Sequence, residues 1–284
     1  MYRDQSRRFA RMAKLSGLAL FLIGSTAQAS LTTIPEIALN NSPGVYTAGG
    51  YYTDTLGPNI VTTDGGNAAN VGGADGRNDD GFMALNLGFN VSFFGNTYNS
   101  LFINNNGNVS FGAGISSYIP SGPTGADAPI ISPFFGDVDT RNSASGVVHY
   151  NLGSDQLIVT WDHVGYYGEH ADRLDSFQLI LRSNSYVVPV GEGVIGFFYQ
   201  GMGWDATDTN TVAAAGFGDG SGNGEVIQGS LASGLNRIVQ DKYLWFDPNL
   251  NVVPPTTVPE PGSLALVAIG LLGATLASRK KRKA

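Results

Sequence analysis

From about residue 82 to residue 246 the chain alternates short apolar runs with polar turn residues. Runs of aromatic and β-branched residues separated by Gly, Asn, Asp, Ser and Thr are typical of β-strands joined by turns. This part of the chain shows no apolar period of 3.6 residues, so we expect few helices, all of them short. The pattern predicts an all-β fold, an antiparallel β-sandwich with loops rich in Gly and Asn.

The positions of these runs predict three antiparallel strand pairs and a closing strand: 101–103 with 109–111, 147–150 with 157–161, 177–181 with 194–199, and 244–246. Asn104-Asn105-Asn106-Gly107 joins the first pair, and its Asn-Gly step favours the positive φ values of a tight hairpin turn. We expect Phe177, Phe197 and Trp245 to pack in the core, because sandwich cores need large aromatic side chains.

Residues 43–81 follow another pattern, with much Gly, Asn, Thr and Asp and few large apolar side chains. We expect one or two short edge strands there and a long polar loop over 64–80. The chain thus divides into a signal peptide at 1–29, a Gly/Asn/Asp-rich extension at 30–86, a β domain at 87–248, a Pro-rich linker at 249–258 and a sorting and anchor segment at 259–284.

The first 29 residues are typical of a secretory signal peptide. A basic region that contains Arg3 and Lys14 precedes a short apolar region at 15–24. Ala27 and Ala29 supply the small residues of a cleavage site before Ser30. The apolar region is too short for a stop-transfer helix, so the sequence predicts export and removal of this segment.

The C-terminal residues combine three features in order. Pro259-Glu260-Pro261 precedes an uncharged apolar run at 263–277, and five cations follow it: Arg279, Lys280, Lys281, Arg282 and Lys283. The run predicts a short membrane helix, and the cations would hold the tail on the cytoplasmic side. This arrangement resembles the PEP-CTERM sorting signal of exopolysaccharide-producing Gram-negative bacteria. An ordinary single-span anchor is the alternative.

The resemblance implies processing by a membrane protease-transpeptidase, the exosortase, as the first partner. It implies transient anchoring in the inner membrane and then delivery to the cell surface or the extracellular matrix.

Setting both ends aside changes the charge of the chain. Five of the 16 basic residues lie in 1–29 and five in the tail, and only Asp4 and Glu260 of the 23 acidic residues lie outside the body. Six basic and 21 acidic residues remain, a net charge of −15. Such a surface repels nucleic acid and anionic lipid and favours cations or neutral polymers. The chain has no cysteine, which excludes disulfides, thiolate zinc sites and iron–sulfur clusters.

Two segments of the body are the most distinctive: Leu101-Phe102-Ile103-Asn104-Asn105-Asn106-Gly107-Asn108-Val109-Ser110-Phe111 and Pro133-Phe134-Phe135-Gly136-Asp137-Val138-Asp139. With other segments of the body they resemble the NIDO domain, the extracellular module named for nidogen. The family commonly has Trp and Ala where this chain has Phe135 and Gly136. The resemblance runs from about residue 87 to 246 and implies an extracellular, non-enzymatic module of cell–matrix adhesion. It supplies no ligand or catalytic residue.

Three acidic groups are candidates for a cation. Asp137 and Asp139 are two apart after a strand-like run, so they could share one calcium ion, or cap backbone N–H groups in a turn. Asp219, Ser221 and Asn223 resemble the first half of an EF-hand loop, but Ser230 occupies the twelfth position, which favours a polar turn. Asp75, Asn78, Asp79 and Asp80 read as a solvated charge run, with a cation as the alternative. No cofactor is required, and calcium is the candidate.

Aromatic residues in or beside the expected loops could stack on sugars: Tyr118, Tyr166, Tyr167 and Trp204. The chain contains neither Gly-x-Ser-x-Gly nor His-Glu-x-x-His, and carboxylate pairs arise by chance in so acidic a domain. We therefore expect no enzyme but a surface protein that contacts extracellular polysaccharide or a matrix protein in a biofilm. The alternatives are a calcium-dependent carbohydrate-binding module and a secreted glycan hydrolase.

Overall fold

A computed structural model describes residues 30–63, 65–69, 74–118, 122–209 and 211–255. The signal peptide, the Pro259-Glu260-Pro261 motif, the apolar run and the basic tail lie outside the described residues. Within those ranges, no helix has the length and apolar character needed to cross a membrane.

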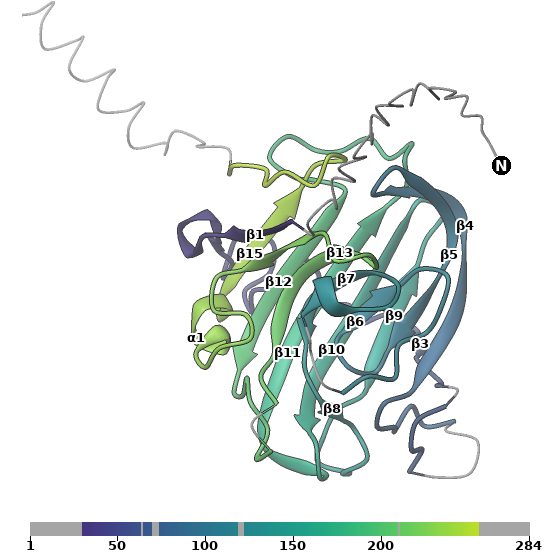
Figure 1. Ribbon diagram of the computed structural model, residues 1–284, viewed down its shortest axis with the longest axis vertical. Coiled ribbons are helices and arrows are strands. Elements are labelled where there is room, and N and C mark those ends of the chain that lie inside the picture. Colours follow the sequence, from purple (N-terminus) through teal and green to yellow (C-terminus); the bar gives the residue numbers. More distant parts are fainter. Residues whose placement is uncertain (1–29, 64, 70–73, 119–121, 210, 256–284) are drawn as a thin grey trace, which may run out of the picture.

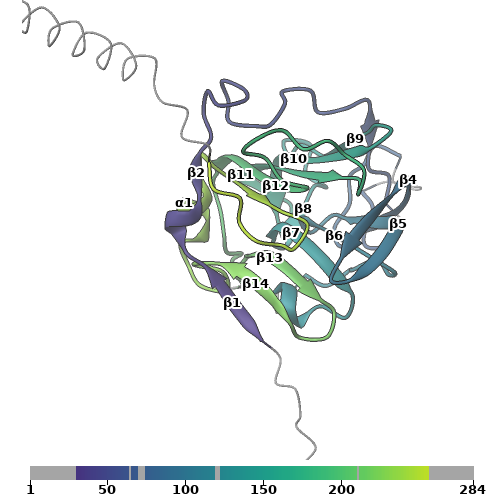
Figure 2. The same cartoon turned by 90° about the horizontal axis from the view of Figure 1, so that it is seen from above.

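Two sheets face each other as a sandwich, and Figure 2 shows them as two layers. The first sheet consists, in spatial order, of β1 (Leu31–Ile34), β14 (Gly224–Ile227), β13 (Ala214–Asp219), β7 (Pro129–Phe135), β6 (Asn108–Ser110), β5 (Asn96–Asn104) and β4 (Phe82–Phe93). The second consists of β2 (Asn40–Asn41), β15 (Lys242–Phe246), β12 (Ile195–Met202), β11 (His170–Arg182), β10 (Gln156–Tyr166), β9 (Val148–Leu152) and β3 (Asn59–Ile60), and β8 (Val138–Asp139) pairs with β10. The predicted antiparallel sandwich is confirmed; of the described pairs only β1–β14 is parallel.

Helices in the described residues are short, as expected from the missing 3.6-residue period. They are two single-turn 3₁₀ helices, η1 (Glu36–Ala38) and η2 (Pro123–Gly125), and one α-helix, α1 (Leu235–Val239). The predicted strand pairs are also confirmed, because Ile103 is opposite Val109, Val159 is opposite Tyr150, and Leu179 is opposite Phe197.

The main core fills the space between the sheets. Alternate residues of each strand point inward, so that Phe197 joins this core while its neighbour Phe198 faces outward. Trp161 stacks on Phe177 with ring centroids 5.1 Å apart, and both side chains are fully buried. Burying side chains of this size stabilises the fold by about 1.5–3 kcal/mol each.

A second apolar cluster covers the outer face of the second sheet. It contains Phe198, Tyr243 and Trp245, and Tyr46 and Tyr52 pack on it from the segment between β2 and β3. This segment runs across the second sheet in Figure 2. Trp245 is therefore buried as predicted, but on the outer face, where its Nε1 donates to the hydroxyl of Tyr46 at 2.9 Å.

The residues before β4 belong to the sandwich. Their short strands β1, β2 and β3 lie at sheet edges, where they pair with β14, β15 and β9. The loop that leads into β4 folds back on the same end of the molecule, because Asp79 forms a β-bridge with Asp139 of β8. The chain thus brings the acidic residues at 79 and 80 beside the β7–β8 connection.

Candidate functional site

Three carboxylates from two distant segments converge at the end of the sandwich beside β8, at the lower end of Figure 1. Asp79 and Asp80 come from the loop before β4, and Asp137 comes from the connection between β7 and β8. One oxygen of each carboxylate lies within 4.8 Å of the others. They line a hollow of about 450 Å³, together with Asn67, Tyr118, Tyr167, Thr209 and Thr211.

The Asn-rich hairpin turn between β5 and β6 holds this site together. The Nδ2 of Asn106 donates to Oδ1 of Asp80 at 2.7 Å, and its Oδ1 accepts from the backbone N–H of Val138 at 3.0 Å. One amide therefore ties the loop before β4 to the residue that follows Asp137. The backbone N–H of Tyr167 donates to the carbonyl of Asp137 at 2.9 Å, which fixes the Tyr167 loop at the same place.

The turn itself is fully buried, so its polar groups need partners within the protein. Asn104 donates from Nδ2 to Oδ1 of Asn108 at 2.7 Å, and Trp161 donates from Nε1 to the carbonyl of Asn105 at 3.0 Å. The sequence predicted the turn but not its burial or its part in the site. Three consecutive amide side chains in a hairpin between apolar strands were the available signal.

Burial and mutual repulsion set the protonation of the three carboxylates. Burial, followed by the charges of Asp80 and Asp79, raises the pKa of Asp137 to about 8. Burial and the charge of Asp139 raise the pKa of Asp79 to about 6. Burial also raises the pKa of Asp80. Carboxylates that lie close together in a site of low dielectric constant resist ionisation in this way.

Asp139, which the sequence pattern pairs with Asp137, has other partners. Its Oδ1 accepts from Nε of Arg141 at 2.9 Å, and its Oδ2 accepts from Nη2 of Arg141 at 2.6 Å and from the backbone N–H of Glu169 at 2.9 Å. Nη2 of Arg141 also lies 3.0 Å from Oδ2 of Asp79. Asp137 thus joins Asp79 and Asp80 in the cluster, while Asp139 forms an ion pair beside it.

The expectation of a solvated charge run at residues 75–80 is wrong for its central members. Asn78 is fully buried and Asp79 is 3% exposed. These residues are buried because their loop pairs with β8 and packs against the hairpin turn.

Asp219 accepts hydrogen bonds from residues of its own turn. Its Oδ1 accepts from the backbone N–H groups of Ser221 and Asn223 at 2.7 and 3.0 Å, and its Oδ2 accepts from Nδ2 of Asn223 at 2.7 Å. This carboxylate therefore caps the backbone of a polar turn, the arrangement that the sequence of this loop favours.

Two of the aromatic residues expected to stack on sugars are buried, so that part of the prediction is wrong. Tyr166 and Trp204 are each 1% exposed. Trp204 packs edge-on against Phe134 and donates from Nε1 to the carbonyl of Val164 at 3.2 Å, and Tyr166 stacks on His170. Tyr167 and Tyr118 are 45% and 49% exposed and line the hollow, which leaves them as its available aromatic surfaces.

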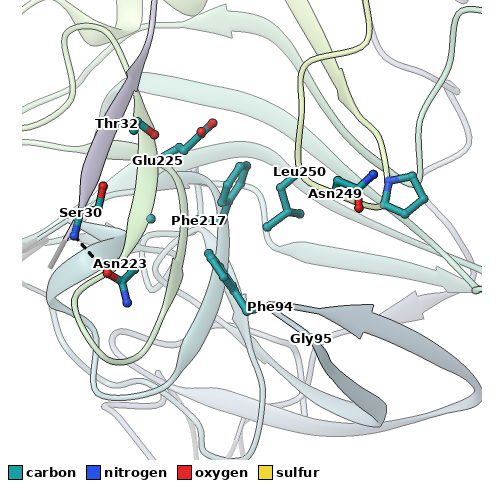
Figure 3. A pocket seen from close by; sticks show the side chains of 11 residues that line it. Ser30, Thr32, Phe94, Gly95, Phe217, Asn223, Glu225, Asn249 and Leu250 are labelled. Atoms are coloured by element: carbon teal, nitrogen blue, oxygen red, sulfur yellow. Dashed lines mark hydrogen bonds between the residues drawn. The ribbon is translucent and has the colours of Figure 1, made fainter. Parts of the chain in front are cut away.

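A second hollow, of about 440 Å³, opens between the first sheet and residues 248–250 (Figure 3). The side chains of Phe94, Phe217 and Leu250 face it, and Ser30 donates from its backbone N to Oδ1 of Asn223 at its rim. Among the described residues, Glu225 is the one titratable residue that lines it. The hollow beside β8 contains three clustered carboxylates and is therefore the stronger candidate for a functional site.

The comparisons with known proteins agree with this architecture. Residues 51–237 match the NIDO-related family, and residues 257–283 match the PEP-CTERM protein-sorting motif. The chain belongs to the NIDO-related family. The two matches together define an exported, surface-sorted protein of the Gram-negative type, whose sorting motif implies processing by exosortase.

Curated relatives resemble this chain over 134 residues each. Nidogen from Drosophila melanogaster is 28% identical over 38% of this chain and 10% of its own length. Alpha-tectorin from Mus musculus is 30% identical over 37% of this chain and 6% of its own length. The chain therefore spans a tenth or less of the length of these relatives. No solved structure matches it significantly.

Proposed function

We propose that this protein is a non-enzymatic adhesion module that links cells to their extracellular matrix and organises exopolysaccharide in a biofilm. It is anchored transiently in the inner membrane, is processed by the exosortase and then acts at the cell surface or in the matrix. The sorting motif and the NIDO-related domain support the location, and the family resemblance supports adhesion.

The observation that carries the proposal is the hollow at the β8 end of the sandwich. It combines two exposed tyrosine rings, Tyr118 and Tyr167, with the hydroxyl groups of Thr209 and Thr211 and three carboxylates. Flat rings beside hydrogen-bonding groups suit a neutral, hydroxyl-rich polymer, because the ring supplies apolar area while the polar groups orient the ligand. An anionic polymer would be repelled by the carboxylates.

Co-sedimentation of the purified protein with the host's exopolysaccharide tests this proposal. We expect retention without release of sugars, and loss of retention when Tyr118 and Tyr167 are both changed to Ala. A matched control replaces Val187 and Val190 with Ser. These residues are 89% and 90% exposed in the loop after β11, at the end of that long strand opposite to the hollow.

Equal retention of the tyrosine variant and the protein would contradict the proposed site. Release of sugars would show that the protein is a glycan hydrolase and not an adhesion module. Failure to bind polysaccharide, with binding to a matrix protein that depends on the two tyrosines, would make the partner a protein.

A further inference from the structure

Two carboxylate oxygens of the acidic cluster are buried without a hydrogen-bond partner among the described residues. They are Oδ1 of Asp79 and Oδ1 of Asp137, in side chains of residues that are 3% and 2% exposed. A buried polar atom without a partner costs about 1–3 kcal/mol, and more when it carries charge. Both residues line the same hollow, so the unpartnered oxygens mark a place that a bound group would complete.

The charge balance around these oxygens indicates the sign of that group. Asp79, Asp80 and Asp137 bring one oxygen each within 4.8 Å of the others, and Asp139 lies opposite Asp79 in a β-bridge. Arg141 is the one cation that forms ion pairs with these carboxylates in the described part of the chain. Arg77 lies nearby, but its Nη1 donates to backbone carbonyls, including that of Thr140 at 2.7 Å. When ionised, four carboxyl groups beside one guanidinium carry an excess of negative charge, and a bound divalent cation would neutralise that charge.

We propose that Asp79, Asp80 and Asp137 bind a calcium ion. All three donors are carboxylates, the hard oxygen ligands that calcium prefers, and the cluster contains neither His nor Cys. Two oxygens that are each 2.3–2.6 Å from one calcium ion can be no more than about 5 Å apart. The separation of at most 4.8 Å within the cluster meets this limit without movement of the backbone.

The surrounding hydrogen bonds leave these ligands available. Asn106 occupies only Oδ1 of Asp80, and Arg141 occupies only Oδ2 of Asp79, so the opposite oxygen of each carboxylate can reach the ion. Calcium takes six to eight oxygen ligands. Three carboxylates therefore leave positions for water or for hydroxyl groups in the hollow. The inference concerns the hollow of the proposed adhesion role but does not rest on that role.

Isothermal titration of the purified, chelator-treated protein with CaCl₂ alone tests the proposal, with thermal unfolding as the second readout. We expect a single site at least as tight as extracellular calcium modules, with a Kd on the order of 10⁻³ M or below. At a hundredfold excess over that Kd, calcium should raise the Tm by roughly 5–10 °C.

Asp137→Asn is the most informative variant, because the side chain keeps its shape and no hydrogen bond of the Asp137 carboxylate is found among the described residues. In chelator its Tm should equal or exceed that of the protein, because Asn is neutral without binding a proton, whereas the buried Asp137 must hold one to avoid a buried charge. In calcium it should gain no stability and bind at least about tenfold more weakly, a loss of ~1.4 kcal/mol. Asp208→Asn is the matched control, because this carboxylate is 67% exposed in the Thr209 loop and outside the cluster.

Absence of calcium binding in the titration would overturn the proposal. So would an Asp137→Asn variant that binds calcium as tightly as the protein does, or an Asp208→Asn variant that loses binding to the same extent. None of these measurements contains polysaccharide, so their outcome is separate from the adhesion test.

Discussion

The side-chain amide of Asn106 joins Asp80 to the backbone of Val138, across 26 residues in one direction and 32 in the other. The loop before β4 and the β7–β8 connection are thereby held against one hairpin turn. The positions of the three clustered carboxylates depend on this amide, because its two ends reach the two segments that carry them.

Replacing Asn106 with Ala should therefore destabilise the protein and loosen the site. The change removes the hydrogen bonds of Asn106 to Oδ1 of Asp80 and to the carbonyl of Ser117, and it leaves the N–H of Val138 with the carbonyl of Gly136 as its acceptor. We expect these losses to cost about 2–4 kcal/mol in the free energy of unfolding. Urea denaturation measures the effect. Asn249→Ala, at an exposed position of the 247–251 turn, should change stability by less than about 0.5 kcal/mol. Equal effects of the two variants would contradict this role of Asn106.

Gly107 closes the same turn, and we expect it to tolerate no side chain. Its φ is +76°, and a Cβ atom there would lie 1.8 Å from the carbonyl oxygen of Phe134. Gly107→Ala should lower the free energy of unfolding by more than about 3 kcal/mol, because backbone strain and a steric overlap add. Gly112 has φ +82° and open space around it, so Gly112→Ala should cost only about 1–2 kcal/mol. Denaturation curves of similar midpoint for the two variants would refute this explanation.

Asp175 should make stability depend on pH. It is fully buried, its Oδ1 accepts from the backbone N–H of Trp204 at 3.0 Å, and burial raises its pKa well above the usual value. The folded state then holds a proton that the unfolded chain releases at about pH 4. This contribution to stability is fully present below pH 4 and is lost as the pH rises through the folded-state pKa.

Asp175→Asn removes that titration and keeps the oxygen that accepts from Trp204. As the pH rises above 4, the variant should become more stable relative to the protein. The total gain should be about 1.4 kcal/mol for each unit by which the pKa of Asp175 in the folded state exceeds that in the unfolded state. Chemical denaturation in chelator from pH 4 to pH 8 measures the difference. Parallel stability curves for the two proteins would show that Asp175 does not titrate in this way.

Processing at the C-terminus should depend on the Pro259-Glu260-Pro261 motif. Changing Pro259 and Glu260 to Ala should leave an unprocessed chain in the membrane fraction of the native host, which mass spectrometry of the fractionated protein would detect. Pro254 and Pro255, in the segment just before the motif, supply the control, since their replacement by Ala should leave processing intact. Normal maturation of the Pro259/Glu260 variant would argue against exosortase recognition of this motif.

Local patterns predicted the strands well because their information lies within each segment. The apolar runs and the Asn-Gly step predicted the β5–β6 hairpin, and Ile103 and Val109 pair as that pattern requires. The acidic cluster could not be predicted in the same way, since Asp80 and Asp137 are far apart in sequence and meet through Asn106. The sequence favoured Asp139 as the partner of Asp137 only because strand periodicity places positions two apart on one face.

The aromatic predictions failed for a related reason. Tyr166 and Tyr167 are adjacent, so strand geometry directs them to opposite sides, but the register shifts in β10 decide which one is buried. Trp204 follows β12 in a loop, yet it closes the end of the core, where a Cβ atom on Gly136 would lie 2.9 Å from its ring. Loop position alone therefore did not indicate exposure.

The most direct test of the adhesion role is the retention of cells in their own matrix. A host strain that lacks this protein would be complemented with the original chain, with the Tyr118→Ala/Tyr167→Ala variant, or with the Val187→Ser/Val190→Ser control, at equal surface amounts. We predict that the original chain and the control restore retention in the biofilm and that the tyrosine variant does not. Full restoration by the tyrosine variant would contradict the assignment of adhesion to the hollow beside β8.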